Sequence, residues 1–222
     1  MPAALERIWE KVLGLPVQIG YVRAPQLASW LRKRWVLARN PHADIRFHGR
    51  SYLGPGFSLH IPGCSTFVVG PGAEFRRNFR AELSPGAKVT IGTRSIFTYD
   101  ALIQCTTTID IGERCVFAES VLIVDGSHRF RDITKPMLDQ GYDFRPLTIE
   151  NDALVSAKCT VINSVGERAV IGANSVVTRP IPAFTVAVGA PARPIDYFGP
   201  PGAEAPEAPS ASQPDINDGA SC

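Results

Sequence analysis

The sequence predicts a mainly β fold in which short strands and turns coil around a three-sided core. Three observations lead to this prediction. The chain of 222 residues has 19 glycines and 19 prolines in a composition that is 45% hydrophobic, which favours short strands and many turns over long helices. Aliphatic or aromatic residues recur every six positions over much of the chain. Glycine often follows these residues, as in Ile91-Gly92 and Ile171-Gly172.

Length and composition limit the class of protein. At roughly 150 residues per domain, the chain has room for one domain with an appendage. No uncharged apolar run approaches ~18 residues, so no transmembrane helix is expected. Glu6, Glu10 and Lys11 interrupt the apolar stretch that a signal peptide would need. A net charge of +2 argues against a nucleic-acid partner, although Arg76, Arg77 and Arg80 alternate with phenylalanines.

Residues 1–43 are predicted to be helical. Apolar residues follow a helical spacing over residues 4–13, and residues 26–39 mix tryptophan and leucine with basic side chains. Residues 21–50 carry seven Lys and Arg against the single acid Asp44. Two interpretations stay open for this segment. The helix caps the coil and shields its strand edges, or it lies on an anionic membrane surface with its tryptophans embedded.

Residues 44–198 carry the internal repeat. Its apolar triplets with a spacing of six are Ile91, Phe97 and Ile103; Ile111, Phe117 and Ile123; Ile149, Val155 and Val161; and Val165, Ile171 and Val177. This period matches neither an amphipathic helix nor strand alternation. It fits a coil in which each hexapeptide supplies one strand and one turn, and in which stacked three-sided coils bury the apolar rows. Glycine beside these rows permits a positive φ or a close backbone approach. A β-sandwich with coincidental spacing is the alternative.

The six-residue register breaks between Ile123 and Ile149. This step is 26 residues long where six would continue the coil, so residues 124–147 are predicted to leave the prism as an extended loop. Long loops on a rigid scaffold often carry function. This loop contains His128, whose residue type titrates near neutrality and can take a proton from a hydroxyl or amine.

The C-terminal tail and the cysteines complete the pattern. Residues 199–222 are rich in Pro, Ala, Ser and Gly and are predicted to be disordered. The five cysteines are scattered and form no CxxC pair. This argues against a zinc site or a disulfide framework and favours reduced thiols in a cytoplasmic protein.

The motifs resemble those of the hexapeptide-repeat acyltransferases, in particular the branch of sugar and glycan O-acetyltransferases and xenobiotic acetyltransferases. The likeness spans residues 89–195 and rests on Ile91-Gly92, Ile111-Gly112, Asp125-Gly126-Ser127-His128, the run 169–178 and the closing run 188–193. The resemblance implies a left-handed parallel β-helix and a homotrimer with active sites between subunits. It also implies acetyl-CoA or another acyl-CoA as co-substrate, and no metal.

The resemblance assigns three catalytic positions. His128 would act as general base, and the backbone N–H of Ala157 would stabilise the oxyanion formed when the thioester is attacked. Asp125 has two open interpretations: it orients the imidazole or forms a turn before Gly126. The family commonly has Trp-Ile-Gly-Ser or Trp-Ile-Gly-Ala where this chain has Leu-Val-Ser-Ala, so Ser156 replaces a glycine.

Contacts to coenzyme A and to the acceptor follow from the same resemblance. Pantetheine would meet backbone at Ala157, Ala173 and Ser175, whereas simple coil packing is the alternative for Ala173 and Ser175. The phosphates would meet Thr178, Arg179 and Arg193, because the arginine fork suits phosphate; a solvated charge is the alternative for both arginines. Acceptor contacts are expected at Thr98, Asp100, Gln140 and Tyr142, with Thr98 where many sugar acetyltransferases have Asn.

The sequence therefore predicts an acyl-CoA-dependent O-acetyltransferase that acts on a hydroxyl of a sugar or glycan. Three alternatives stay open. One is N-acetylation of an antibiotic or amino sugar, and another is a non-catalytic β-helix scaffold. The third is a metal-dependent carbonic anhydrase on the same prism, which would need three converging histidines.

Overall fold

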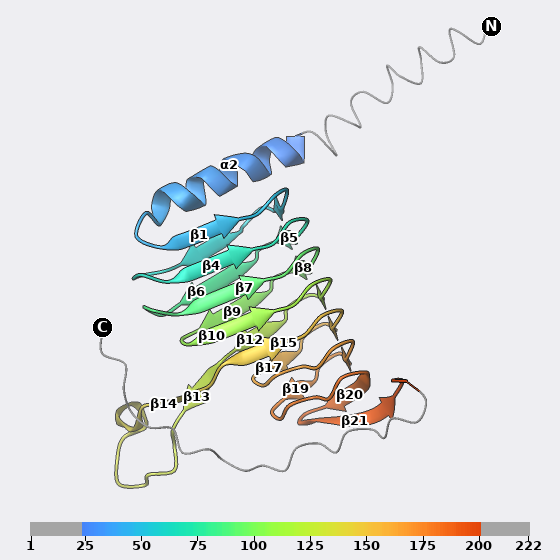
Figure 1. Ribbon diagram of the computed structural model, residues 1–222. Coiled ribbons are helices and arrows are strands. Elements are labelled where there is room, and N and C mark those ends of the chain that lie inside the picture. Colours follow the sequence, from blue (N-terminus) through green and yellow to red (C-terminus); the bar gives the residue numbers. More distant parts are fainter. Residues whose placement is uncertain (1–23, 201–222) are drawn as a thin grey trace, which may run out of the picture.

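The computed structural model describes residues 24–200 of the chain (Figure 1). The helical stretch predicted for residues 4–13 lies outside the described residues. So does the predicted disordered tail, apart from Gly199 and Pro200.

The chain winds into a three-sided prism whose faces are parallel β-sheets (Figure 1). Sheet A contains β1 (Asp44–Phe47), β4 (Thr66–Val69), β7 (Lys88–Ile91), β10 (Thr108–Ile111) and β15 (Leu147–Ile149). Sheet B contains β2 (Tyr52–Leu53), β5 (Glu74–Arg77), β8 (Ile96–Tyr99), β11 (Val116–Phe117), β16 (Leu154–Val155), β18 (Val170–Ile171), β20 (Thr185–Gly189) and β21 (Ala192–Tyr197). Sheet C contains β3 (Ser58–His60), β6 (Arg80–Leu83), β9 (Leu102–Cys105), β12 (Leu122–Val124), β17 (Thr160–Val161) and β19 (Val176–Val177). The last strand, β21, returns antiparallel along β20.

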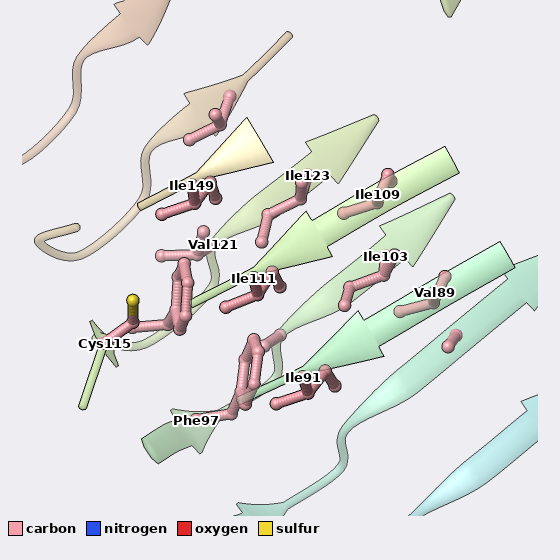
Figure 2. Close-up of a cluster of buried hydrophobic side chains, with 14 of the residues drawn as sticks. Val89, Ile91, Phe97, Ile103, Ile109, Ile111, Cys115, Val121, Ile123 and Ile149 are labelled. Atoms are coloured by element: carbon pink, nitrogen blue, oxygen red, sulfur yellow. The ribbon is translucent and has the colours of Figure 1, made fainter. Parts of the chain in front are cut away.

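Successive coils stack residue upon residue. Ile91 pairs with Ile111, and Ile111 pairs with Ile149, along sheet A. Figure 2 shows these side chains one above another inside the prism, where they are buried. The rings of Phe97 and Phe117 stack with centroids 4.4 Å apart. The mainly β class predicted from the repeat and the parallel sheets implied by the resemblance are confirmed, while the left hand of the winding stays a prediction.

Glycines at the corners allow the backbones of neighbouring coils to approach closely. A Cβ on Gly92 would collide with the backbone of Gly112 in the next coil. Positive φ falls two residues later instead, on Arg94 (59°) and Arg114 (56°). The N–H of Arg114 donates to the Thr93 carbonyl at 2.8 Å, so this left-handed corner links adjacent coils. Of the two roles predicted for these glycines, close approach therefore applies at Gly92.

The helix α2 (Ala24–Arg39) lies across the first coil (Figure 1). The hydroxyl of Ser29 accepts a hydrogen bond from the N–H of Leu53 at 2.8 Å, and Arg32 donates to the Leu53 carbonyl at 2.7 Å. Both backbone groups belong to β2, at the end of sheet B. Side chains of the helix thus provide hydrogen-bond partners for the backbone of an edge strand, as expected of a helix that caps the prism. No helix within residues 24–200 combines the length and hydropathy needed to cross a bilayer.

The chain leaves the prism between β12 and β15, where the register break predicted a loop. Its two arms form an antiparallel hairpin of β13 (Gly126–His128) and β14 (Tyr142–Phe144). A single 3-10 turn, η2 (Met137–Gln140), lies near the tip. Figure 1 shows this hairpin, hereafter the 125–146 hairpin, extending away from the prism.

Candidate active site

His128 ends β13 and its side chain is open to solvent. It pairs with Tyr142 across the 125–146 hairpin, and the two rings lie 4.3 Å apart, tilted by 42°. Tyr142 in turn stacks on Phe144, with centroids 5.3 Å apart. The aromatic pair thus supports one side of the imidazole, while the residue as a whole stays exposed.

Asp125 is buried at the root of the hairpin, only 2% exposed. Its carboxylate accepts hydrogen bonds from the backbone N–H of Thr106 (2.9 Å), the N–H of Thr107 (2.6 Å) and the Thr107 hydroxyl (2.8 Å). Among the hydrogen bonds of residues 24–200, none joins Asp125 to the imidazole. The structure therefore gives Asp125 an anchoring contact, to the turn between β9 and β10, that neither interpretation from sequence included.

The thiol of Cys105 lies beside this buried carboxylate, with Sγ 3.7 Å from an oxygen of Asp125. Burial, followed by the nearby negative charge of Asp125, raises the pKa of Cys105 to about 12. The thiol is therefore protonated at neutral pH and is a poor nucleophile.

A groove of about 680 Å³ runs along sheet C to His128. His60, Glu82 and Gln104 line it from three successive coils and pair in register through β3, β6 and β9. The amide of Gln104 donates to the Glu82 carboxylate at 3.0 Å. Tyr142 closes the groove at the hairpin end. The groove thus offers hydrogen-bonding groups along its floor and an aromatic face beside the imidazole.

Sequence reasoning missed the polar row of His60, Glu82 and Gln104. The three residues are spaced by 22, which is longer than three hexapeptides. The early corners between sheets C and A contain extra residues: four residues, including Pro85-Gly86, join β6 to β7, where two residues join β9 to β10. A search for a period of six therefore passes over this row. A search for polar residues at the same strand position in each coil would have found this row.

The predicted acceptor residues divide into two groups. Tyr142 lines the groove, and Gln140 lines a second cavity of about 400 Å³ on the other side of His128. Thr98 and Asp100 instead belong to β8 and the turn after it, at the corner between sheets B and C. Asp100 accepts a hydrogen bond from Asn78, and the Thr98 hydroxyl is buried without a partner among residues 24–200. The structure does not bring these two residues to His128 within one copy of the chain.

Ala157 occupies the corner that joins β16 to β17. Its N–H donates no hydrogen bond to any of the described residues 24–200, while its carbonyl accepts one from Asn174 at 2.9 Å. Lys158, the next residue, has a φ of 59°. Proline stands at the matching place of three other corners, each time before a residue with positive φ: Pro55, Pro71 and Pro85. The fold therefore does not need an N–H at this place, and that of Ala157 is available to a ligand. Ala173 repeats the same geometry one coil later.

The remaining predicted coenzyme A contacts lie in the last coils. Ser175 is buried, its hydroxyl accepts from the Gly189 N–H at 3.0 Å, and its carbonyl accepts from Thr160. These contacts match the alternative of coil packing. Thr178, Arg179 and Arg193 are exposed. Their side chains are thus accessible to a phosphate group.

Within one copy of the chain, His128 and the Ala157 corner lie apart. The 125–146 hairpin leaves the corner between sheets C and A, whereas Ala157 lies at the corner between sheets B and C. Neither cavity beside His128 includes Ala157 or the exposed residues of the last coils. The general base and the expected oxyanion donor therefore lie on opposite edges of sheet C.

The carbonic anhydrase alternative called for converging histidines. In the described part of the chain, no three His, Cys, Asp or Glu side chains come close enough together to hold a metal ion. His60 and His128 line the same groove, whereas His42 bonds to the carbonyl of Ile61 at 2.6 Å.

Comparison with curated proteins finds acetyltransferases. The chain is 31% identical over 167 residues to the probable acetyltransferase Rv3034c of Mycobacterium tuberculosis, covering 74% of this chain and 54% of that protein. It is 34% identical over 116 residues to the galactoside O-acetyltransferase of Escherichia coli, covering 50% and 55%. The chain thus spans about half the length of the curated relatives it matches. No family model matches the chain.

Solved structures share the fold. One is a hexapeptide-repeat acetyltransferase of Vibrio cholerae complexed with acetyl-coenzyme A. Its alignment covers 90% of this chain and 91% of that chain, with a TM-score of 0.51 and 19% identity. A variant of AntD, an N-acyltransferase of Bacillus cereus in complex with dTDP and coenzyme A, covers 77% and 88%, with a TM-score of 0.53 and 18% identity. The chain is thus similar in sequence to acetyltransferases over its repeat region, and it shares the fold of the hexapeptide-repeat acyltransferases.

Proposed function

We propose that this protein is an acyl-CoA-dependent O-acetyltransferase that modifies a hydroxyl of a sugar or glycan. The observation that carries the proposal is the accessible imidazole of His128 at the end of a polar groove. The two curated relatives named above support an acetyl donor, because both are acetyltransferases by name, and the name of one gives a galactoside as its acceptor. Acetyl-coenzyme A is present in one of the solved structures that share the fold.

The chemistry needs one proton acceptor and one fixed hydrogen-bond donor. His128 takes the proton of the acceptor hydroxyl as its oxygen attacks the thioester carbonyl carbon. The carbonyl oxygen becomes an oxyanion, which the N–H of Ala157 stabilises. When the tetrahedral intermediate collapses, the C–S bond breaks and the thiolate of coenzyme A takes the proton from the imidazolium. No redox step occurs, and the imidazole returns to its neutral form.

A second copy of the chain completes this site in a homotrimer. The support is geometric: His128 and Ala157 lie on opposite edges of sheet C in one copy, and the 125–146 hairpin extends away from its own prism (Figure 1). A neighbouring prism would bring its Ala157 and Ala173 corners to this hairpin. Its exposed Arg179 and Arg193 would then bind the phosphates of coenzyme A.

The groove along sheet C binds the acceptor. Glu82, Gln104 and His60 offer hydrogen bonds to sugar hydroxyls, and the face of Tyr142, 46% exposed, can pack against a sugar ring. The groove crosses from the first coil to the fourth, which is roughly 14 Å at the spacing of neighbouring strands. This length favours an extended glycan over a single sugar.

A thiol-release assay tests the proposal. Acetyl-coenzyme A is offered with a panel of sugars, glycans and antibiotics, and mass spectrometry identifies the product. We expect a hydroxyl of a sugar or glycan to be acetylated. A product acetylated on nitrogen would support the N-acetyltransferase alternative instead, and failure to bind coenzyme A by calorimetry would support the scaffold.

A further inference from the structure

The helix α2 turns its large apolar side chains away from the prism. Ser29 and Val36 face the first coil and are buried. Leu27, Trp30, Leu31 and Trp35 are between 52% and 63% exposed. Leu27 and Leu31 are one turn apart with the tryptophans beside them, so the four share one side of the helix, hereafter the outer face of α2. An exposed helix face with two tryptophans is typical of a surface that contacts a partner.

Positive charge surrounds this outer face. The helix has four basic side chains and no acidic one. The guanidinium of Arg34 lies over the Trp30 ring at 5.3 Å, and that of Arg39 lies over the Trp35 ring at 5.6 Å. Asp44 is the single acid among residues 24–63 and already pairs with Arg46 at 2.7 Å. The helix itself thus presents tryptophan and arginine and no acidic side chain, a composition that complements anionic lipid headgroups.

The acceptor groove begins beside this helix. A cavity of about 280 Å³ is lined by Trp35 and Arg39 from α2 and by His60 and Glu82 from the first two coils. His60 and Glu82 also line the groove that leads to His128. Figure 1 shows α2 across the end of the prism. The outer face is exposed, and Trp35 at its border also lines this cavity, so the face lies beside the start of the groove.

We propose that the outer face of α2 docks the protein on an anionic lipid surface. The tryptophans and leucines enter the headgroup region, while Arg34 and Arg39 bind lipid phosphates. In this orientation the prism stands on the membrane, and the groove leads from the lipid surface to His128. The acceptor is then a glycan whose anchor remains in the bilayer; this last step rests on the proposed function.

Vesicle cosedimentation of the full chain tests the docking without any substrate. Vesicles of phosphatidylcholine and phosphatidylglycerol should bind the protein, and vesicles of phosphatidylcholine alone should bind it more weakly. Replacing both arginines (Arg34→Gln with Arg39→Gln) should weaken binding to anionic vesicles by roughly thirtyfold, at about 1 kcal/mol per basic residue. The pair Trp30→Ala and Trp35→Ala should weaken binding to both kinds of vesicle.

The 125–146 hairpin offers a matched control. There the guanidinium of Arg131 lies over the Phe130 ring at 5.3 Å, and Phe130 is 59% exposed. The pair Phe130→Ala and Arg131→Gln should leave vesicle binding unchanged. Absence of binding to anionic vesicles, or binding that the α2 variants do not alter, would overturn the docking. So would a change of sedimentation coefficient of the α2 variants without vesicles, because the outer face would then join copies of the chain.

The acceptor step has a separate test. The same glycan acceptor is supplied free or coupled to a lipid in anionic vesicles. The intact chain should acetylate the lipid-coupled form faster. The single variant Trp30→Ala, which leaves the cavity lined by Trp35 intact, should reduce this difference while keeping its rate on the free form. Equal rates on both forms would refute the anchored acceptor and leave docking and acetyl transfer untouched. Absence of turnover on both forms, with vesicle binding retained, would refute the proposed function instead.

Discussion

His128 has the setting of a proton acceptor: an accessible imidazole, one supporting ring and a groove that ends beside it. We expect His128→Ala to lower kcat by about 10²–10⁴-fold, the usual contribution of a general base. Thiol release with the acceptor found in the panel measures the change. His48→Ala, which removes an exposed imidazole from the first coil, is the control and should retain full activity. Unchanged turnover in His128→Ala would refute the assignment.

Asp125 acts, on this structure, as an anchor of the hairpin root. In Asp125→Asn the amide keeps the volume, but one acceptor oxygen replaces two and the negative charge is lost, so the charge-assisted hydrogen bonds from Thr106 and Thr107 weaken. We expect the free energy of unfolding to fall by about 1–3 kcal/mol. Urea denaturation measures this change, and Asp139→Asn in the exposed turn η2 is the control.

The pH profile of kcat separates anchoring from orienting. If Asp125 only anchors the hairpin, the Asn variant keeps the midpoint of the wild-type profile. A shifted midpoint without loss of stability would instead show that the carboxylate acts on the imidazole.

At the scale of single elements, the strand β9 ends at the buried residue Cys105, whose thiol contacts Asp125 at the root of the hairpin. Its thiol has a pKa of about 12 in the folded protein against 9.0 ordinarily. Below pH 9 both states keep the proton. Above it, the unfolded chain ionises first, so stability falls as the pH rises from 9 towards 12. Unfolding free energies measured over this range should fall less steeply in Cys105→Ala. Equal slopes would contradict the assignment of this effect to Cys105.

The later coils were predictable from the sequence because stacking imposes one strict period. Ile91, Phe97 and Ile103, and then Ile111, Phe117 and Ile123, enter the prism at intervals of six, and the break after Ile123 located the hairpin. The first two coils gave a weaker pattern, since the corner between sheets C and A is two residues longer at Pro85-Gly86 than at Thr106-Thr107. Asp125 reaches Thr107 across 18 residues, a contact created by stacking that no local pattern carries.

At the scale of the whole molecule, the prism separates the three parts of the proposed mechanism. The helix α2 covers one end and the 125–146 hairpin extends from the prism (Figure 1). The hairpin leaves the edge between sheets C and A, and the Ala157 corner lies at the opposite edge of sheet C. The sequence indicated His128 and Ala157 as candidate residues but not how far apart they lie, because that depends on which corner of the prism each residue occupies. Since the two lie on opposite edges of sheet C, the proposed mechanism requires an active site that two copies of the chain share.

Complementation between two inactive variants tests that claim most directly. His128→Ala removes the base. Ala157→Pro removes only the N–H, in a corner position that Pro55, Pro71 and Pro85 show to be compatible with the fold. Thr93→Pro, at a corner between sheets A and B, is the matched control and should stay active. The two inactive chains are co-expressed with different tags, and complexes that contain both are purified.

If the site is shared between neighbours, each mixed trimer has one site with an intact His128 and an intact Ala157. Thiol release should then recover to about one third of the wild-type rate, as expected for a closed ring of three. If a single copy holds the whole site, no mixed complex has an intact one. Activity no higher than that of the two parent variants would contradict the account.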